Sequence, residues 1–196
     1  MRRALAPALL LAALLLLQAC GPRALTVGSR PFPAGRPVFV DASGDPLSAL
    51  PAAAEPVRLV LLEFPWCPAC ADAWKALRAT ADRLPPGSAR VYRVLFDRET
   101  AITAAGRREV SPLRPFPVPG FESPEGAGGL AITELIALPG AFREEFRVSQ
   151  APVLLILGGD GTVERRWVGY SPAMAGEVAD EVRKRSPAPS PLPPGK

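Results

Sequence analysis

The stretch FPWCPAC, residues 64–70, decides how the rest of the chain is interpreted. It places Cys67 and Cys70 two residues apart, directly after Trp66. Two cysteines at this spacing can form a redox-active disulfide, supply half of a metal site, or be a coincidence of composition. The neighbouring residues and the composition of the whole chain narrow this choice.

The cysteine pair lies between a predicted strand and a predicted helix. VRLVLLEF, residues 57–64, is a nearly continuous apolar run, which is typical of a central strand buried on both faces. From Pro68 to Leu84 the apolar residues recur at helical spacing, and Pro85-Pro86-Gly87 ends the helix. The first cysteine is therefore expected just before the helix begins.

Further elements are predicted on both sides of this unit. Ser171 is a good N-cap with Pro172 at the first helical position, and this last helix should run to about Arg185. The other predicted elements are a hairpin at 36–50, a strand at 89–97, a short helix at 130–138, the end of a helix at 141–148, a hairpin at 153–170 and a disordered Pro-rich tail at 186–196.

The composition excludes several kinds of chemistry. The chain of 196 residues contains no histidine, so Ser-His-Asp and Cys-His catalysis and histidine-containing zinc sites are excluded. A zinc site needs four ligands, and with 3 cysteines and no second cysteine pair no metal is predicted. The net charge of +4 is scattered and forms no basic stripe with interleaved aromatic residues, which argues against nucleic-acid binding.

The first twenty residues, MRRALAPALLLAALLLLQAC, are predicted to direct export. Two arginines precede an apolar stretch, residues 4–17, which is shorter than the roughly 20 apolar residues of a membrane-spanning helix. The stretch ends in Leu17-Gln18-Ala19-Cys20, which resembles the lipobox of bacterial lipoproteins. The resemblance implies that residues 1–19 are a signal peptide and that Cys20 is lipidated. A plain signal peptide or an uncleaved anchor, with Cys20 incidental, is the alternative.

Residues 20–36 are then predicted to be a lipidated tether rich in Gly, Pro and Arg. Cys20 is followed by Gly21 instead of aspartate, which by the same resemblance slightly favours the outer membrane. The predicted location is a bacterial membrane, on the side facing the periplasm or the exterior. Disulfides persist there, and lipidation of Cys20 leaves Cys67 and Cys70 to pair with each other.

The order of these elements resembles the thioredoxin fold. The residues that carry the resemblance are Trp66, Cys67, Cys70, Pro152 and the Gly-Asp-Gly turn at 159–161. The resemblance covers residues 37–185 and implies an α/β three-layer sandwich with a central mixed sheet flanked by helices. The N-terminal hairpin and an insertion at 98–137, with a Pro-rich loop at 111–129, make the chain most similar to the exported, membrane-tethered branch of the TlpA and ResA type.

The resemblance also implies roles for individual residues. Cys67 attacks, Cys70 resolves the resulting mixed disulfide, and Pro152 is a cis proline lying against the Cys67–Cys70 disulfide. The predicted substrate groove comprises Trp66, Pro68, Ala69, Ala151 and Pro152. The position of Cys67 supports this independently, because a helix N-terminus lowers a thiol pKa from about 8.5 to roughly 3.5–7. A purely structural disulfide is the alternative, although a loop this short stabilises a fold little.

The chain departs from the thioredoxin pattern at two places near the motif. Many thioredoxins carry a buried acid six residues before the first cysteine, where this chain has Leu61. Glu63 lies two residues further along, on the same face by strand periodicity, and is a candidate for proton transfer. A solvated carboxylate at the rim of the sheet is the alternative. The intervening dipeptide is Pro-Ala, and because it strongly affects the redox potential, the direction of electron flow stays open.

The predicted function is that of a membrane-anchored thiol–disulfide oxidoreductase that reduces disulfides of exported proteins. No cofactor is predicted, because the Cys67/Cys70 pair itself carries the electrons. The predicted partners are exported proteins with thiols or disulfides and a membrane electron donor or acceptor. Two alternatives are a disulfide-donating oxidase of the same fold and a redox-inactive, tethered protein-binding module. A peroxidase is disfavoured, because no Thr and Arg flank a single reactive cysteine.

Overall fold

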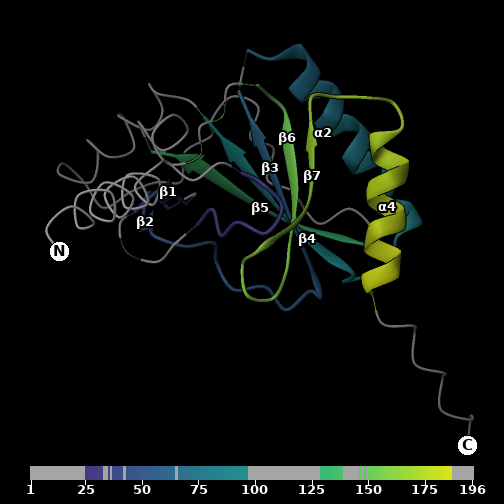
Figure 1. Cartoon of the computed structure of the whole chain (residues 1–196), viewed down its shortest axis with the longest axis horizontal. Coiled ribbons are helices and arrows are strands. Elements are labelled where there is room, and N and C mark those ends of the chain that lie inside the picture. The colour runs from purple at the N-terminus through teal and green to yellow at the C-terminus, as the bar shows by residue number, and fades with distance from the viewer. Residues whose placement is uncertain are drawn as a thin grey trace, which may run out of the picture.

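The computed structural model describes residues 25–32, 35, 37–41, 43–64, 66–96, 129–138, 146, 148 and 150–186. Within this part the chain forms one mixed sheet and two α-helices (Figure 1). The strands are β1 (Phe39–Val40), β2 (Pro46–Leu47), β3 (Val57–Glu63), β4 (Ala89–Leu95), β5 (Leu130–Ala137), β6 (Val153–Leu157) and β7 (Val163–Val168), and the helices are α2 (Pro68–Thr80), the short 3-10 helix η1 (Ala81–Arg83) and α4 (Met174–Arg185).

The strands lie in the order β2-β1-β5-β4-β3-β6-β7. The central strand β3 runs parallel to β4 and antiparallel to β6, as expected of a strand that is apolar along nearly its whole length. The predicted α/β class with a mixed sheet is confirmed. So are the N-terminal hairpin, formed by β1 and β2, and the later hairpin, formed by β6 and β7.

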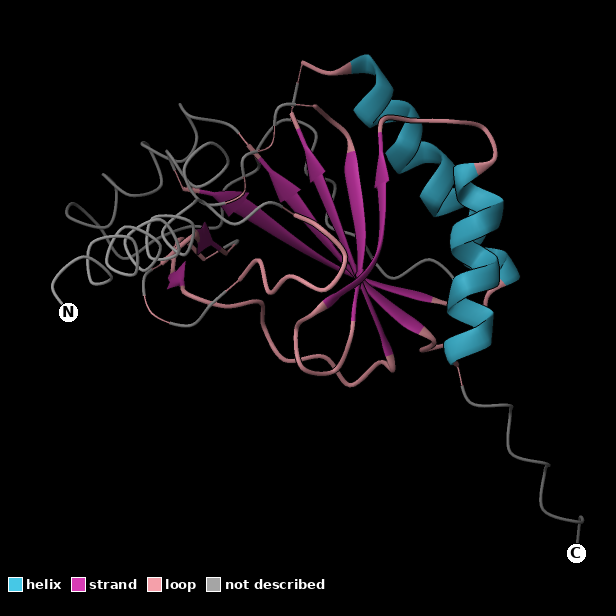
Figure 2. Ribbon diagram, in the orientation of Figure 1, coloured by secondary structure: helices cyan, strands magenta, loops and turns pink. Residues whose placement is uncertain are grey.

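Both described helices cover the same face of the sheet (Figure 2). On that face, Leu59 and Leu61 of β3 pack in one core cluster with residues of α2 and α4. On the opposite face, Val60 and Leu62 belong to a second cluster that includes Phe146. The alternation along β3 therefore places odd-numbered residues, Glu63 among them, on the helix-covered face.

The predicted helix at 130–138 is wrong, because this segment forms strand β5. β5 lies parallel to β4 from Leu130 to Ile136 and antiparallel to β1 at its end. A short apolar segment fits either helical or extended periodicity. Pairing with strands on both sides decides the outcome here, and the β-branched residues Ile132, Thr133 and Ile136 suit an extended chain. The insertion predicted at 98–137 thus ends in a strand of the sheet itself.

The predicted helix starts and ends differ slightly from the observed ones. α2 begins at Pro68 as predicted, and its last turn tightens into η1 before Leu84. α4 begins at Met174 instead of Pro172, and its N-cap, Ala173, makes no side-chain hydrogen bond. Ser171 contributes its carbonyl oxygen, which accepts a hydrogen bond from Met174 N at 3.1 Å.

The N-terminal strap, defined here as residues 25–32, packs against the domain. The Leu25 side chain is only 3% exposed and belongs to the core cluster on the face opposite the helices. The Phe32 ring lies 5.3 Å from that of Phe39 and 5.1 Å from that of Phe146. Part of the predicted tether is therefore folded onto the sheet. Cys20, residues 98–128 and the predicted tail beyond residue 186 lie outside the described residues, as does most of the predicted helix at 141–148.

None of the helices in the described part of the chain is long and apolar enough to cross a membrane.

Gly129 lies where no side chain fits, just before β5. A Cβ atom there would approach the carbonyl oxygen of Pro85 to 2.5 Å and that of Leu84 to 2.6 Å. We expect Gly129→Ala to lower the free energy of unfolding by about 1–3 kcal/mol, since backbone would have to move. Gly159→Ala, at an exposed position with no atom within 4 Å of the new Cβ, is the matched control. Equal urea midpoints for the two variants would contradict this expectation.

Candidate active site

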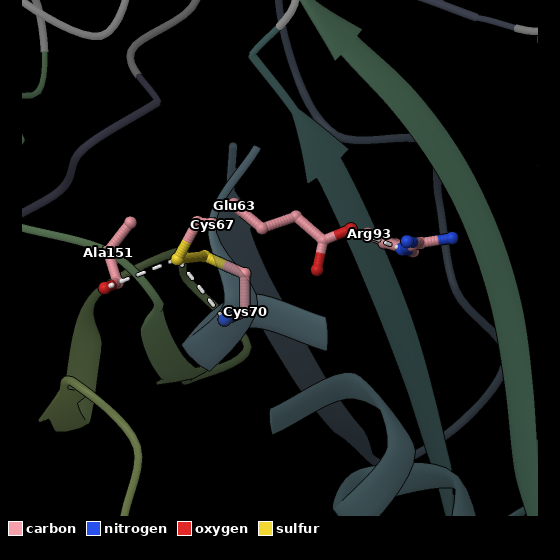
Figure 3. Close-up of a disulfide and its surroundings, with 5 residues drawn as sticks. All are labelled: Glu63, Cys67, Cys70, Arg93 and Ala151. Atoms are coloured by element: carbon pink, nitrogen blue, oxygen red, sulfur yellow. Dashed lines mark hydrogen bonds and ion pairs between the residues drawn. A yellow bond between two sulfur atoms is a disulfide. The ribbon is translucent and has the colours of Figure 1, made fainter. Parts of the chain in front are cut away.

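Cys67 and Cys70 form a disulfide at the N-terminus of α2, with their Cα atoms 5.2 Å apart (Figure 3). Cys67 is the N-cap residue, and its Sγ accepts a hydrogen bond from Cys70 N at 3.2 Å. Pro68 occupies the first helical position, where the absent N–H is not needed by the helix. Cys67 is half-buried, whereas Cys70 is buried beneath it. Of the two sulfurs, that of Cys67 is the accessible one.

The loop before β6 lies directly against this disulfide. The Ala151–Pro152 peptide bond is cis, and Cys67 Sγ lies 3.7 Å from the carbonyl oxygen of Ala151. Gly169 N donates a hydrogen bond to the carbonyl oxygen of Pro152 at 2.8 Å, which ties this loop to the end of β7. The predicted groove residues on the helix and those on the loop are thus brought together around Cys67.

Aromatic side chains border the accessible sulfur. Trp66 is 68% exposed and stacks on the ring of Phe64 at 5.3 Å. Phe64 in turn meets Phe96 edge-on at 5.2 Å. Val168 and Tyr170, which flank Gly169 at the end of β7, are also exposed. An exposed apolar border around a half-buried sulfur is suited to contact with a polypeptide.

Glu63 is buried at the end of β3, with only 2% of its surface exposed. Figure 3 shows its side chain extending from beside the cysteines toward Arg93 of β4, whose Nε donates to Glu63 Oε1. Glu63 Oε2 is buried and has no hydrogen-bond partner within the described part of the chain. Burial raises the pKa of Glu63 to about 6, although the ion pair with Arg93 opposes this rise. The alternative of a solvated carboxylate at the rim of the sheet is therefore wrong.

Arg93 joins the buried carboxylate of Glu63 to the mostly buried carboxylate of Glu134, a feature that was not predicted from the sequence. Its Nη1 lies 3.1 Å from Glu134 Oε1 on β5, and its guanidinium carbon lies 4.7 Å from the centre of the Trp74 ring on α2. Burial also raises the pKa of Glu134. The available signal was a pair of charged residues, Glu63 and Arg93, in two neighbouring predicted strands that are otherwise rich in apolar residues. The partner on β5 could not be found while that segment was predicted as a helix.

We expect Glu63→Gln to change how stability depends on pH. The folded chain holds the Glu63 proton more tightly than the unfolded chain, because the pKa rises from 4.5 to about 6. Ionisation of Glu63 therefore destabilises the wild type as the pH rises through this interval, by about 2 kcal/mol in total. Glutamine mimics the protonated acid and removes that loss. Urea unfolding at pH 4 and pH 7.5 measures it, and parallel pH profiles for the two chains would contradict the expectation.

No group of three or more His, Cys, Asp or Glu side chains able to hold a metal ion occurs among the described residues.

Comparison with known proteins identifies the fold. No family model matches the sequence, and no curated protein matches it as a relative. A thioredoxin-like protein from Porphyromonas gingivalis is similar in structure, with a TM-score of 0.55, 18% identity, and coverage of 78% of this chain and 91% of that one. A thiol:disulfide interchange protein from Bacteroides sp. gives a TM-score of 0.51 at 14% identity and covers 81% of this chain and 91% of its own. The chain thus has a thioredoxin-like fold.

Proposed function

We propose that this chain is a thiol–disulfide oxidoreductase that acts on disulfides of other proteins. One observation carries the proposal: the Cys67–Cys70 disulfide is at the start of α2, with the half-buried sulfur of Cys67 facing the carbonyl oxygen of Ala151. A thiolate formed at Cys67 would be stabilised by the helix N-terminus and by the N–H of Cys70. The similarity to a thiol:disulfide interchange protein in fold agrees with this chemistry.

The proposed reduction proceeds in two exchange steps. The Cys67 thiolate attacks one sulfur of the substrate disulfide, forms a mixed disulfide and releases the other substrate sulfur as a thiolate, which takes up a proton. Cys70 then loses its proton and attacks Cys67 Sγ, which releases the second substrate thiol. Two electrons pass to the substrate, and the chain is left with the Cys67–Cys70 disulfide. The same steps in reverse would oxidise a dithiol.

The apolar border would hold an extended substrate segment over Cys67. Trp66 directly precedes Cys67, and the end of β7 is tied to Pro152 through Gly169 N. The Ala151–Pro152 backbone would supply the polar edge along which such a segment lies. Apolar contacts with little side-chain specificity would suit a site that exchanges with different protein thiols.

Glu63 is proposed to accept the proton of Cys70 before the second exchange step. A pKa of about 6 leaves the carboxylate mostly ionised at neutral pH and basic enough to accept a proton. Its free oxygen, Oε2, is the atom not committed to Arg93. Glu63→Gln should therefore slow release of the mixed disulfide, leave its formation unchanged, and remove an inflection near pH 6 from the rate profile.

We further propose that the protein is exported, anchored through a lipid on Cys20, and works as a reductant of exported proteins. The charged and apolar N-terminal residues and the lipobox-like Leu17–Cys20 sequence support this location. Replacing Cys20 with alanine should move the protein out of the membrane fraction. Unchanged membrane fractionation of this variant would rule out the lipid anchor.

The reduction potential of the Cys67/Cys70 pair decides among the candidate functions. It is measured on the purified chain in glutathione and dithiothreitol buffers, with tryptophan fluorescence as the readout. A value near −270 mV, similar to that of thioredoxin, would support a reductant that is recharged by an electron donor. A value near −120 mV would support the oxidase. A pair that cannot be cycled would leave the redox-inactive binding module.

A further inference from the structure

The N-terminal strap is fixed to one end of the β6–β7 hairpin. Gly28 N donates to the carbonyl oxygen of Val163, and Val163 N donates to that of Ser29, both at 2.8 Å. Arg30 Nη2 lies 2.7 Å from Asp160 Oδ2 in the hairpin turn. These contacts hold the strap beside the turn between β6 and β7, which we call the hairpin end of the domain.

The disulfide lies at the other end of the same hairpin. Val153 of β6 pairs with Val168 of β7, and these residues adjoin Pro152 and Gly169 at the site. Val163, which binds the strap, is at the opposite end of β7. A strand of this length spans roughly 20 Å, at about 3.3 Å per residue. The contacts that fix Gly28, Ser29 and Arg30 of the strap and the disulfide therefore lie at opposite ends of the hairpin.

Only a short stretch of chain joins the strap to Cys20. Ser29 N bonds to the carbonyl oxygen of Thr26, which closes a turn and keeps Leu25 close to Arg30 and the hairpin end. Leu25 is itself held in the core. The five residues from Cys20 to Leu25 reach at most about 18 Å when fully extended. A lipid on Cys20 would thus bring the hairpin end close to the membrane surface.

The exposed apolar side chains divide between the two ends. Among the described residues, the exposed large apolar side chains are Val27, Trp66, Val168 and Tyr170. Trp66 directly precedes Cys67, and Val168 and Tyr170 flank Gly169, which bonds to Pro152 at the same end of the hairpin as the disulfide. Val27, 64% exposed, is at the tip of the strap turn at the hairpin end. An exposed apolar side chain such as Val27, close to a lipid attachment point, can be buried in the membrane interface.

We infer that the hairpin end, with Val27 at its tip, rests on the lipid surface while the Cys67–Cys70 disulfide faces away from it. The inference rests on the proposed lipidation of Cys20. Its consequence concerns partners: substrates and the electron donor must approach from the aqueous side. A donor embedded in the bilayer would need a thiol-bearing domain that projects well above the lipid surface.

Tryptophan fluorescence tests this orientation, because all three native tryptophans lie toward the disulfide end. Trp66 borders Cys67, Trp74 contacts Arg93, and Trp167 pairs with Leu154. The full lipidated chain is placed in phosphatidylcholine–phosphatidylglycerol vesicles that carry a nitroxide on the lipid head group. The emission added by Val27→Trp should be quenched, and the wild-type emission should be unchanged.

Tyr170→Trp is the matched control, because it adds a tryptophan at an exposed position of the disulfide end. Its added emission should survive in the same vesicles. Equal quenching of the two variants, or quenching of the wild type, would overturn the inferred orientation. Flotation of the vesicles distinguishes a wrong orientation from failure of the lipid anchor. A chain that does not float with the vesicles refutes both the lipidation and the orientation. The redox proposal is tested separately, by the reduction potential.

Discussion

A Cys67→Ser chain is expected to reduce protein disulfides no faster than the uncatalysed reaction. Serine cannot form the thiolate that attacks the substrate disulfide, and Cys70 is buried beneath the position of the lost sulfur. The measurement is the rate of insulin disulfide reduction with dithiothreitol as the electron source. Substantial activity in Cys67→Ser would show that another group attacks, and the assigned mechanism would then be wrong.

Cys70→Ser is the informative companion variant. It keeps the accessible thiol and loses the group that resolves the mixed disulfide. The variant should therefore accumulate covalent complexes with substrate proteins, which appear on non-reducing gels and disappear after reduction. Cys67→Ser in the same gel is the control and should form none. If Cys70→Ser also forms none, the accessible sulfur does not attack, which favours the redox-inactive binding module.

Arg93→Ala is expected to be the most destabilising single substitution near the site. Arg93 is 13% exposed and is the shared ion-pair partner of Glu63 and Glu134, both of them nearly buried. Removing one member of a buried ion pair destabilises by about 3–5 kcal/mol, because the remaining charge keeps its desolvation penalty. Urea unfolding at pH 7.5 measures this loss.

The destabilisation by Arg93→Ala should shrink as the pH falls. Without the guanidinium, burial acts unopposed on the pKa of Glu63 and of Glu134, so both acids take up protons more readily in the folded chain. A neutral carboxyl needs no counter-charge. Arg165→Ala is the control: this arginine is 54% exposed and pairs with Glu181, so its removal should cost less than about 1 kcal/mol. Similar losses in the two variants would contradict the role given to Arg93.

The elements next to the cysteine motif could be predicted because their patterns have a single physical solution. A long apolar run such as β3 has to be buried on both faces, and the prolines and glycine after η1 cannot continue a helix. β5 could not be predicted in the same way. Its eight residues do not determine a periodicity, and its conformation follows from hydrogen bonding to β4 and β1, which are distant in the sequence.

The features of the site also differ in whether the sequence could predict them. The Cys67–Cys70 disulfide could be predicted from local spacing, and the cis bond before Pro152 from the resemblance to thioredoxin. The burial of Glu63 depends on where the neighbouring strands and α2 lie, and its charge partner comes from β4. Glu134 enters only through the register of β5 against β4, where it pairs with Arg93. A network built from three strands and a helix cannot be deduced from one segment at a time.

β7 is an edge strand of the sheet, and this affects how readily the protein associates in concentrated solution. An exposed edge strand offers unpaired backbone N–H and C=O groups to a second molecule and is a common starting point for aggregation. Here the strap occupies the outward N–H and carbonyl of Val163, and the exposed side chains of Glu164, Arg165 and Arg166 follow in succession. Two β7 edges that paired along their whole length would have to displace the strap at Val163 and bring these charges together. Association through this edge should therefore be weaker than through an uncovered, uncharged edge strand.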